Sequence, residues 1–286
     1  MTSAERGKAD RMGSDNTVVV GGAGTGIGRA VARRLTADGF EVVAVGRRRK
    51  PLESLASELG PKVHIVGADL ATGTGAATVA AWFESRGRGC AGVVAAAGGI
   101  AGEVPADGGS MEDALGAVRR DWQACFESNV LTAVLLVQAL RKPIEHDGGR
   151  VVLISSVAAL RGSFGGAYGA MKAALHAWSF DLARELGRHG GTANVIAPGF
   201  VPDTEFWAGR LTAESRRERA AQTLVGREGT PAEIASLISW LLGPDGGRSR
   251  RRGPRRFRRA SARLATIGAF VRAAARGPHR PPTPLR

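Results

Sequence analysis

Short runs of hydrophobic residues alternate with longer amphipathic stretches from Thr17 to about Leu242. The short runs are continuously apolar, which is typical of parallel strands that are buried on both faces. The longer stretches repeat hydrophobic residues every three or four positions and predict helices. The expected strands are 17–20, 41–45, 62–66, 92–95, 150–155 and 192–196. The expected helices are 27–37, 51–59, 75–85, 122–140, 167–187 and 231–242.

This order of elements predicts an α/β fold with a doubly wound parallel sheet of the Rossmann type. Repeated strand–helix–strand units with right-handed crossovers place helices on both faces of such a sheet. Thr230 and Pro231 mark the start of the last helix, because threonine caps helices and proline suits their first turn. We expect a disordered N-terminus at 1–16, one domain at 17–246 and a disordered tail at 247–286.

The positive charge is concentrated at one end of the chain. The net charge is +14, and residues 247–286 contain thirteen arginines without any lysine or acidic residue. The remainder of the chain is therefore close to neutral. Clustered arginines attract polyanions, so the tail is expected to bind nucleic acid only nonspecifically. Phe257 and Phe270 are its only aromatic residues, which leaves little capacity for base stacking.

The same sequence argues against a secreted, membrane or metal-binding protein. Residues 1–16 lack the apolar core of a secretion signal, and the longest apolar run, 130–140, is too short to span a bilayer. Cys90 and Cys125 form no CxxC or Cys/His cluster and fit reduced thiols. We expect a cytoplasmic protein with no membrane partner and no metal.

A glycine-rich loop follows the first expected strand and opens the first expected helix. Glycines at this junction let the backbone turn sharply and approach a pyrophosphate, which the helix N-terminus then faces with its N–H groups. The sequence therefore predicts a dinucleotide site within the 17–246 domain. Its first residues are Gly22, Gly24, Thr25, Gly26, Ile27 and Gly28.

The end of the second strand favours NADP(H), with NAD(H) as the alternative. Gly46 stands where a carboxylate would bind the ribose 2′-hydroxyl of NAD, and Arg47 can meet a 2′-phosphate. A solvated basic turn is the other interpretation of Arg47. After the third strand, Asp69 and Leu70 are candidates for contact with the adenine, and an N-cap is an equal alternative for Asp69.

Tyr168, the only tyrosine, lies four residues before Lys172, so both side chains share one face of a helix. A phenol titrates near pH ~10, and a neighbouring ammonium favours its ionised form. We therefore expect Lys172 to lower the pKa of Tyr168, which would make the phenol an acid–base group for a carbonyl.

Taken together, these motifs resemble the short-chain dehydrogenase/reductase family over about residues 17–244. The resemblance depends on the order and spacing of the glycine loop, Ala97-Gly98, Asn129, Ser155-Ser156, Tyr168/Lys172, Pro198-Gly199 and Thr204. It implies hydride transfer between nicotinamide and a carbonyl or alcohol carbon, with a small-molecule or acyl-chain substrate. Within the family, the chain is similar to 3-oxoacyl-carrier reductases.

The resemblance also implies a role for each matching residue. Tyr168 would move the proton, and Lys172 would hold the nicotinamide ribose as well as tune Tyr168. A serine would stabilise the carbonyl oxygen. Asn129 would bend its helix around a water linked to Lys172. Ala97, Gly98, Pro198, Gly199 and Thr204 would line the dinucleotide.

The catalytic serine is either Ser155 or Ser156. The usual family gap to the tyrosine selects Ser155, whereas the local sequence at the strand exit selects Ser156. Adjacent strand residues face opposite ways, so only one can reach the substrate. We choose Ser156.

Residues 203–223 should form a mobile helical lid over the substrate. Phe206 and Trp207 would give it an apolar wall. Its arginines would either meet an anionic carrier or form a solvated face; they are Arg210, Arg216, Arg217 and Arg219.

Three departures from the family pattern stand out. Gly21 replaces a threonine and Ala96 an asparagine, and each would cost about 1 kcal/mol if a buried partner were left unpaired. After residue 246 the expected final strand is replaced by the arginine-rich tail. Our hypothesis is a reading-frame shift in a GC-rich gene, and a family-like strand should then appear in another frame. A homo-oligomer is expected if this C-terminus permits it, and a non-catalytic NADP-binding relative is the alternative function.

Overall fold

The computed structural model describes residues 16–100, 110–146, 148–162, 166–244 and 246. The predicted disorder of residues 1–15 and the predicted tail with its replaced strand lie outside them. Asn16, which we assigned to the N-terminal segment, is hydrogen bonded next to the sheet. Its carbonyl oxygen accepts from the Glu41 amide at 3.1 Å, and its side chain donates to the carbonyl of Gly39 at 3.1 Å.

Six parallel strands form one sheet in the order β3-β2-β1-β4-β5-β6. The strands are β1 (Thr17–Gly21), β2 (Glu41–Gly46), β3 (Val63–Gly67), β4 (Gly92–Ala95), β5 (Arg150–Ile154) and β6 (Thr192–Ile196). Every strand expected within the described residues is present, and the predicted doubly wound parallel sheet is confirmed. The strand order reverses between β1 and β4, and ligands bind at the carboxyl ends of strands at such a point.

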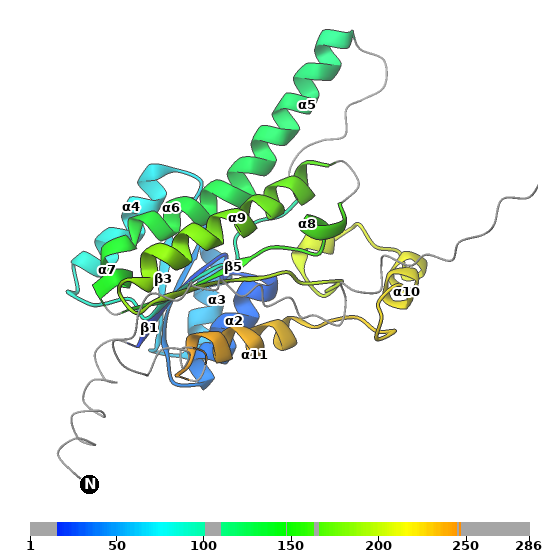
Figure 1. The fold of residues 1–286 in the computed structure, drawn as a ribbon. Coiled ribbons are helices and arrows are strands. Elements are labelled where there is room, and N and C mark those ends of the chain that lie inside the picture. The colour runs from blue at the N-terminus through cyan, green and yellow to red at the C-terminus, as the bar shows by residue number, and fades with distance from the viewer. Residues whose placement is uncertain (1–15, 101–109, 147, 163–165, 245, 247–286) are drawn as a thin grey trace, which may run out of the picture.

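Helices cover both faces of the sheet (Figure 1). One face carries α4 (Gly73–Glu84), α6 (Thr132–Ala139), α7 (Arg141–His146) and α9 (Ala167–Gly187). The other carries α2 (Gly26–Ala37), α3 (Arg49–Leu59) and α11 (Pro231–Leu242).

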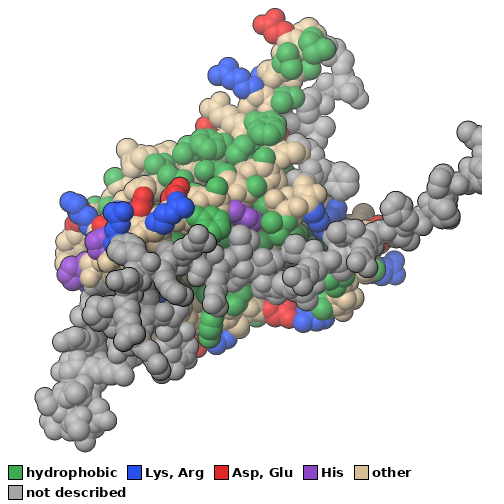
Figure 2. Space-filling view, in the orientation of Figure 1, with side chains coloured by type: hydrophobic (Ala, Val, Ile, Leu, Met, Phe, Trp, Pro, Cys, Tyr) green, Lys and Arg blue, Asp and Glu red, His purple; other side chains and the backbone are tan. Residues whose placement is uncertain are grey.

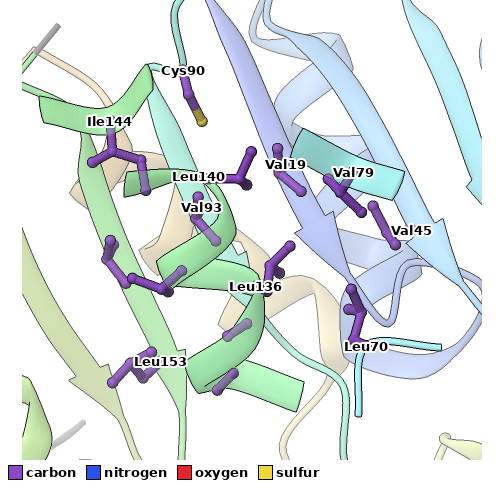
Figure 3. Packing of buried hydrophobic residues seen from close by; sticks show 14 of the residues in the cluster. Val19, Val45, Leu70, Val79, Cys90, Val93, Leu136, Leu140, Ile144 and Leu153 are labelled. Atoms are coloured by element: carbon purple, nitrogen blue, oxygen red, sulfur yellow. The ribbon is translucent and has the colours of Figure 1, made fainter. Parts of the chain in front are cut away.

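A hydrophobic core lies on each face of the sheet, and successive residues of a central strand point alternately into one core and the other. Val19 belongs to the core beneath α4, α6 and α9, where it lies with Val93 and Leu136 (Figure 3). Val18 and Val20 belong to the core beneath α2, α3 and α11. This alternation of buried side chains explains why the strands read as continuous apolar runs.

The helix predicted at 122–140 begins earlier than expected. In the structure α5 (Met111–Phe126) continues through a π-helical turn, η1 (Glu127–Leu131), into α6. Ser110 caps α5: its hydroxyl accepts from the Asp113 amide at 3.2 Å, and the Asp113 carboxylate accepts from the Ser110 amide at 3.1 Å. This capping box starts a helix that projects from the body of the protein (Figure 1).

The predicted lid contains two helical segments, η2 (Glu205–Trp207) and α10 (Ala213–Ala221), and α8 (Ala158–Arg161) lies after β5. The predicted cap of α11 is confirmed. Thr230 accepts from the Glu233 amide at 3.2 Å, Glu233 accepts from the Thr230 amide at 2.8 Å, and Pro231 is the first helical residue. None of the described helices is long and apolar enough to cross a membrane.

The departures at Gly21 and Ala96 leave no buried side chain unpaired. A Cβ at Gly21 would lie 2.9 Å from Leu136 and 3.0 Å from Leu70, so these leucines fill the space that a threonine would need. Among the described residues, the only buried side-chain nitrogen or oxygen atom without a partner is the Thr192 hydroxyl. The loss of about 1 kcal/mol considered for each position is therefore not incurred through an unpaired side chain.

Candidate active site

The candidate site residues gather at one edge of the sheet because they follow parallel strands. The glycine loop follows β1, Ala97-Gly98 follows β4, Ser156 follows β5, and Pro198-Gly199 follows β6. The carboxyl ends of these strands meet at the same edge. Residues from distant parts of the sequence can therefore face one ligand.

The glycine loop has the backbone geometry of an anion cradle. Gly22 has φ +77° and donates its N–H to the carbonyl of Val45 at 2.9 Å. A Cβ at Gly28 would lie 2.1 Å from the carbonyl oxygen of Gly22, so only glycine permits this turn. Thr25 caps α2 without a side-chain hydrogen bond to the helix. The first N–H groups of α2 thus lack a side-chain cap and suit a pyrophosphate.

The other members of the loop support the same turn. Gly26 has φ +52°. The carbonyl oxygen of Gly24 accepts from Arg29 at 3.4 Å, while Ile27 is partly buried against the core beneath α2. The backbone of these residues can therefore face a ligand while their side chains support the loop.

The turn after β2 presents two arginines to solvent. Arg47 is exposed and forms no ion pair within the described part of the chain. Arg48 forms an ion pair with Glu205 of η2. A guanidinium at the carboxyl end of β2 is thus placed where it could meet a phosphate.

Asp69 and Leu70 differ in what they offer a ligand. Asp69 is exposed, and its carboxylate accepts from the Ala71 amide at 3.1 Å. Thr72 caps α4 by accepting from the Gly75 amide at 3.1 Å, so the alternative role of Asp69 as the N-cap is wrong. The Leu70 side chain is buried in the core, which leaves only its backbone for a ligand.

Tyr168 and Lys172 lie one turn apart near the start of α9, as predicted. The Ser156 side chain lies near enough to the Tyr168 hydroxyl to favour its ionised form. The Lys172 side chain is 4% exposed, and its Nζ lies 5.8 Å from the centre of the Tyr168 ring. The same Nζ donates to the carbonyl of Ile154 at 3.0 Å, which fixes the ammonium at the carboxyl end of β5.

The electrostatics differ from the expectation. Burial raises the pKa of Tyr168 to about 12, although the nearby Ser156 side chain acts in the opposite direction. Burial also lowers the pKa of Lys172 to about 8. The lowering of the Tyr168 pKa that we expected from Lys172 is therefore wrong for this structure. Burial disfavours the charged form of both groups.

The two adjacent serines have different surroundings. Ser155 is 3% exposed; its hydroxyl donates to the carbonyl of Lys172 at 2.9 Å and lies 2.7 Å from Nε2 of His176. Ser156 is partly exposed and meets Tyr168. The structure thus brings Ser156, not Ser155, to the phenol.

Asn129 lies buried in the π-helical turn η1. Its Nδ2 donates to the carbonyls of Gly99 at 2.8 Å and Cys125 at 3.0 Å, and its Oδ1 accepts from the Gly99 amide at 3.1 Å. A Cβ at Gly98 would lie 2.6 Å from this Oδ1 and 2.9 Å from Nζ of Lys172. Gly98 therefore lets the strand end pass close to both polar side chains.

The segment after β6 folds over the edge of the sheet. The Pro198 carbonyl accepts from the Val157 amide at 3.0 Å, and Gly199 is exposed. Thr204 lies against the glycine loop, because a Cβ at Gly26 would be 3.3 Å from the Thr204 Cβ. The Phe206 ring lies 5.4 Å from the ring of Tyr168, between centroids.

The arginines of the predicted lid are not a uniform solvated face. Arg216 pairs with Glu228 at 2.5 Å and with Asp203 at 3.0 Å, and the Arg219 guanidinium stacks 5.0 Å from the Trp207 ring centroid. The two others, Arg210 and Arg217, are exposed. Two of the four lid arginines, Arg216 and Arg219, thus interact with other side chains of the protein.

Sequence reasoning missed Glu205 and Cys125. Glu205 contacts the glycine loop, and Cys125 lies one helical turn before Asn129, with Sγ 3.5 Å from Nδ2. Their only sequence signal is position, next to Thr204 and four residues before Asn129. The described residues hold no group of three or more His, Cys, Asp or Glu side chains that could bind a metal.

Comparison with known proteins gives consistent matches. The family model described as short chain dehydrogenase matches residues 16–215. The short-chain reductase protein NovJ of Streptomyces niveus is 32% identical over 254 residues, covering 82% of this chain and 90% of NovJ. The NADP-dependent 3-hydroxy acid dehydrogenase YdfG of Escherichia coli (strain K12) is 30% identical, covering 78% and 88%. A crystal structure of a single-residue variant of actinorhodin polyketide ketoreductase with NADPH aligns with TM-score 0.71 and 25% identity, covering 82% and 92%.

Proposed function

The chain belongs to the short-chain dehydrogenase family and is an oxidoreductase of carbonyl or alcohol groups, and we propose that it uses NADP(H) with Tyr168 as its general acid and base. One observation carries the proposal. The Tyr168 hydroxyl meets Ser156 beside the buried Lys172, at the sheet edge where the glycine loop also ends. The substrate is a small-molecule or acyl-chain carbonyl compound or the corresponding alcohol.

The cofactor assignment is supported by the loop and by the relatives. The glycine loop fits a pyrophosphate, Gly46 offers no carboxylate, and Arg47 is available for a 2′-phosphate. A YdfG relative is named NADP-dependent, and the ketoreductase structure contains NADPH. The nicotinamide, when bound, supplies or accepts the hydride. The residues proposed to hold the cofactor are Gly22, Gly24, Thr25, Gly26, Ile27, Gly28, Arg47, Asp69, Leu70, Ala97, Gly98, Tyr168, Lys172, Pro198, Gly199 and Thr204.

Tyr168 is suited to donate a proton during reduction. With a pKa of about 12 the phenol stays protonated at neutral pH. Its O–H can be given to the oxygen of a carbonyl as that oxygen becomes an alkoxide, which is a stronger base than the phenolate. Ser156 hydrogen bonds the same oxygen and stabilises its growing charge. Proton transfer leaves a phenolate on Tyr168, which must be reprotonated before the next turnover.

Asn129 acts in this proposal as a positioning residue. Its side chain ties Gly99 to the π-helical turn and thereby fixes Gly98 against the Lys172 ammonium. A water between Asn129 and Lys172 would connect the lysine with solvent and allow Tyr168 to be reprotonated. The buried polar atoms on both side chains suit such a water.

A non-catalytic NADP-binding relative is the second candidate, and it is motivated by the altered sequence after residue 246. The experiment is to mix the purified full chain with NADPH and a panel of aliphatic, aromatic and 3-oxoacyl ketones. Consumption of NADPH that depends on a ketone is the expected result. Tight NADPH binding without turnover of any ketone would favour the second candidate.

We also propose that the chain forms a homo-oligomer through α5. The projecting helix exposes one apolar stripe along its length (Figure 2), and a contiguous exposed patch of this kind marks an interaction surface. The stripe consists of Met111, Leu115, Val118, Trp122 and Phe126. Sedimentation of the full chain should give the mass of a dimer or larger; a monomer at every concentration would refute the proposal.

A further inference from the structure

The segment Thr204–Trp207 reaches both halves of the candidate site. Thr204 and Glu205 lie against the glycine loop, and Phe206 lies against the catalytic ring. A short 3₁₀ turn joins these contacts, so the backbone that carries Glu205 also carries Phe206. Movement at one contact must therefore be felt at the other.

Glu205 places a carboxylate beside the loop that is built for phosphate. Its Oε2 accepts from the Thr25 hydroxyl at 3.3 Å and pairs with the Arg48 guanidinium. Thr25 is the N-cap of α2 and has no side-chain bond to its own helix. A negative charge is favourable at a helix N-terminus and beside an arginine, so Glu205 takes up the interactions that a phosphate would seek there.

Phe206 lies against the ring of the catalytic tyrosine. Its ring centroid lies 5.4 Å from that of Tyr168, and the next ring, Trp207, lies 5.0 Å from Phe206. Trp207 is held in turn by Phe200 at 5.4 Å and by the Arg219 guanidinium. This aromatic chain thus lies beside the phenol that a carbonyl compound must approach.

We propose that Glu205 couples cofactor binding to substrate access: it holds η2 over the site until the cofactor phosphates displace it from Thr25 and Arg48. This inference depends on the proposed function, because it assumes that the glycine loop binds NADP(H). Two anions cannot share one cationic and helix-terminal site without repulsion. Once Glu205 is displaced, η2 loses its bond to the glycine loop and can move away from the Tyr168 ring.

The size of the effect is limited by the exposure of the pair. The side chains of Arg48 and Glu205 are 61% and 52% exposed, and exposed ion pairs are weak and screened by salt. We therefore expect Glu205→Gln to tighten NADPH binding about two- to fivefold at low salt, with a smaller gain at high salt. The neutral amide keeps the shape of the side chain but no longer competes as an anion.

The test compares Glu205→Gln with Glu214→Gln in the full chain. Glu214 is exposed on α10 of the same lid, so its replacement removes one negative charge without touching the loop. NADPH dissociation constants are measured by fluorescence titration, and backbone hydrogen exchange at residues 204–207 is measured without cofactor. Glu205→Gln should bind NADPH more tightly and exchange faster, whereas Glu214→Gln should match the wild type in both.

Two results would overturn the inference. One is an NADPH affinity of Glu205→Gln equal to that of Glu214→Gln, and the other is unchanged exchange at residues 204–207. Wild-type protein that binds no NADPH would instead count against the proposed function. The exchange measurement needs no cofactor and still decides whether Glu205 holds the segment closed.

Discussion

Ser155 and Ser156 are neighbours with opposite roles in this account. Ser155 joins β5 to α9 through Lys172 and His176, whereas Ser156 points to Tyr168. The sequence placed both at the strand exit but could not decide between them by spacing. Strand geometry required that only one face the substrate, and the start of α9 determined which one.

Replacing each serine by alanine should affect a different property of the protein. Ser156→Ala should lower kcat/KM about a hundredfold or more with little change in stability, because it removes a group that binds developing charge. Ser155→Ala should instead lower the free energy of unfolding by about 1–3 kcal/mol, because it leaves buried partners unpaired. Steady-state kinetics and urea unfolding of both variants would show this crossover. The reverse pattern would make Ser155 the catalytic serine.

The buried charge of Lys172 should lower the free energy of unfolding at neutral pH. Burial lowers its pKa from 10.5 to about 8, so between these values the unfolded chain binds more protons than the folded chain. Stability must therefore rise with pH across this window, and the penalty is full below pH about 8. Lys172→Met removes the penalty but leaves the Ile154 carbonyl without its donor, for a net gain of about 1–2 kcal/mol at neutral pH.

Urea unfolding at several pH values checks this prediction. The advantage of Lys172→Met should shrink as the pH rises from about 8 to about 10, because the wild-type lysine then loses its charge. The exposed Lys142 provides the control, and Lys142→Met should stay within about 0.5 kcal/mol of wild type throughout. A pH-independent difference for Lys172→Met would show that the charge is not the cause.

At the scale of elements, the hydrophobic pattern was sufficient to predict each described strand and most helices. It missed the start of α5, although Met111, Leu115 and Val118 are spaced as on one face of a helix; this face is exposed rather than packed on the core. The π-helical turn at Glu127–Leu131 could not be predicted either. Asn129, which the family resemblance implied would bend its helix, lies in this turn and bonds both Cys125 within the helix and the distant Gly99.

The end of β1 gives a prediction about packing. Gly21→Thr restores the residue expected from the family resemblance, yet it should destabilise the protein by about 1–3 kcal/mol through overpacking against Leu70 and Leu136. Gly67→Thr is the matched control, because Gly67 also ends a strand and has no atom within 4 Å of an added Cβ. Thermal or urea unfolding of both variants would suffice. Equal stability of Gly21→Thr and the wild type would contradict the packing account.

For the whole molecule, the sequence could predict the doubly wound sheet and the place of the site, because both follow from the order of strands. It could not predict how the lid meets the loop. Glu205 and Thr25 are 180 positions apart, and no pattern pairs them. The raised pKa of Tyr168 could not be predicted from the sequence either, because it depends on burial in the completed fold rather than on the spacing to Lys172.

The most direct test of the central claim is ketone-dependent NADPH consumption by Tyr168→Phe beside the wild type. The substitution removes one hydroxyl and keeps the ring that contacts Phe206. We predict a loss of about 10²–10⁴-fold in kcat/KM with an NADPH dissociation constant close to that of wild type. A Tyr168→Phe variant that turns over the same ketone at the wild-type rate would contradict proton transfer by Tyr168.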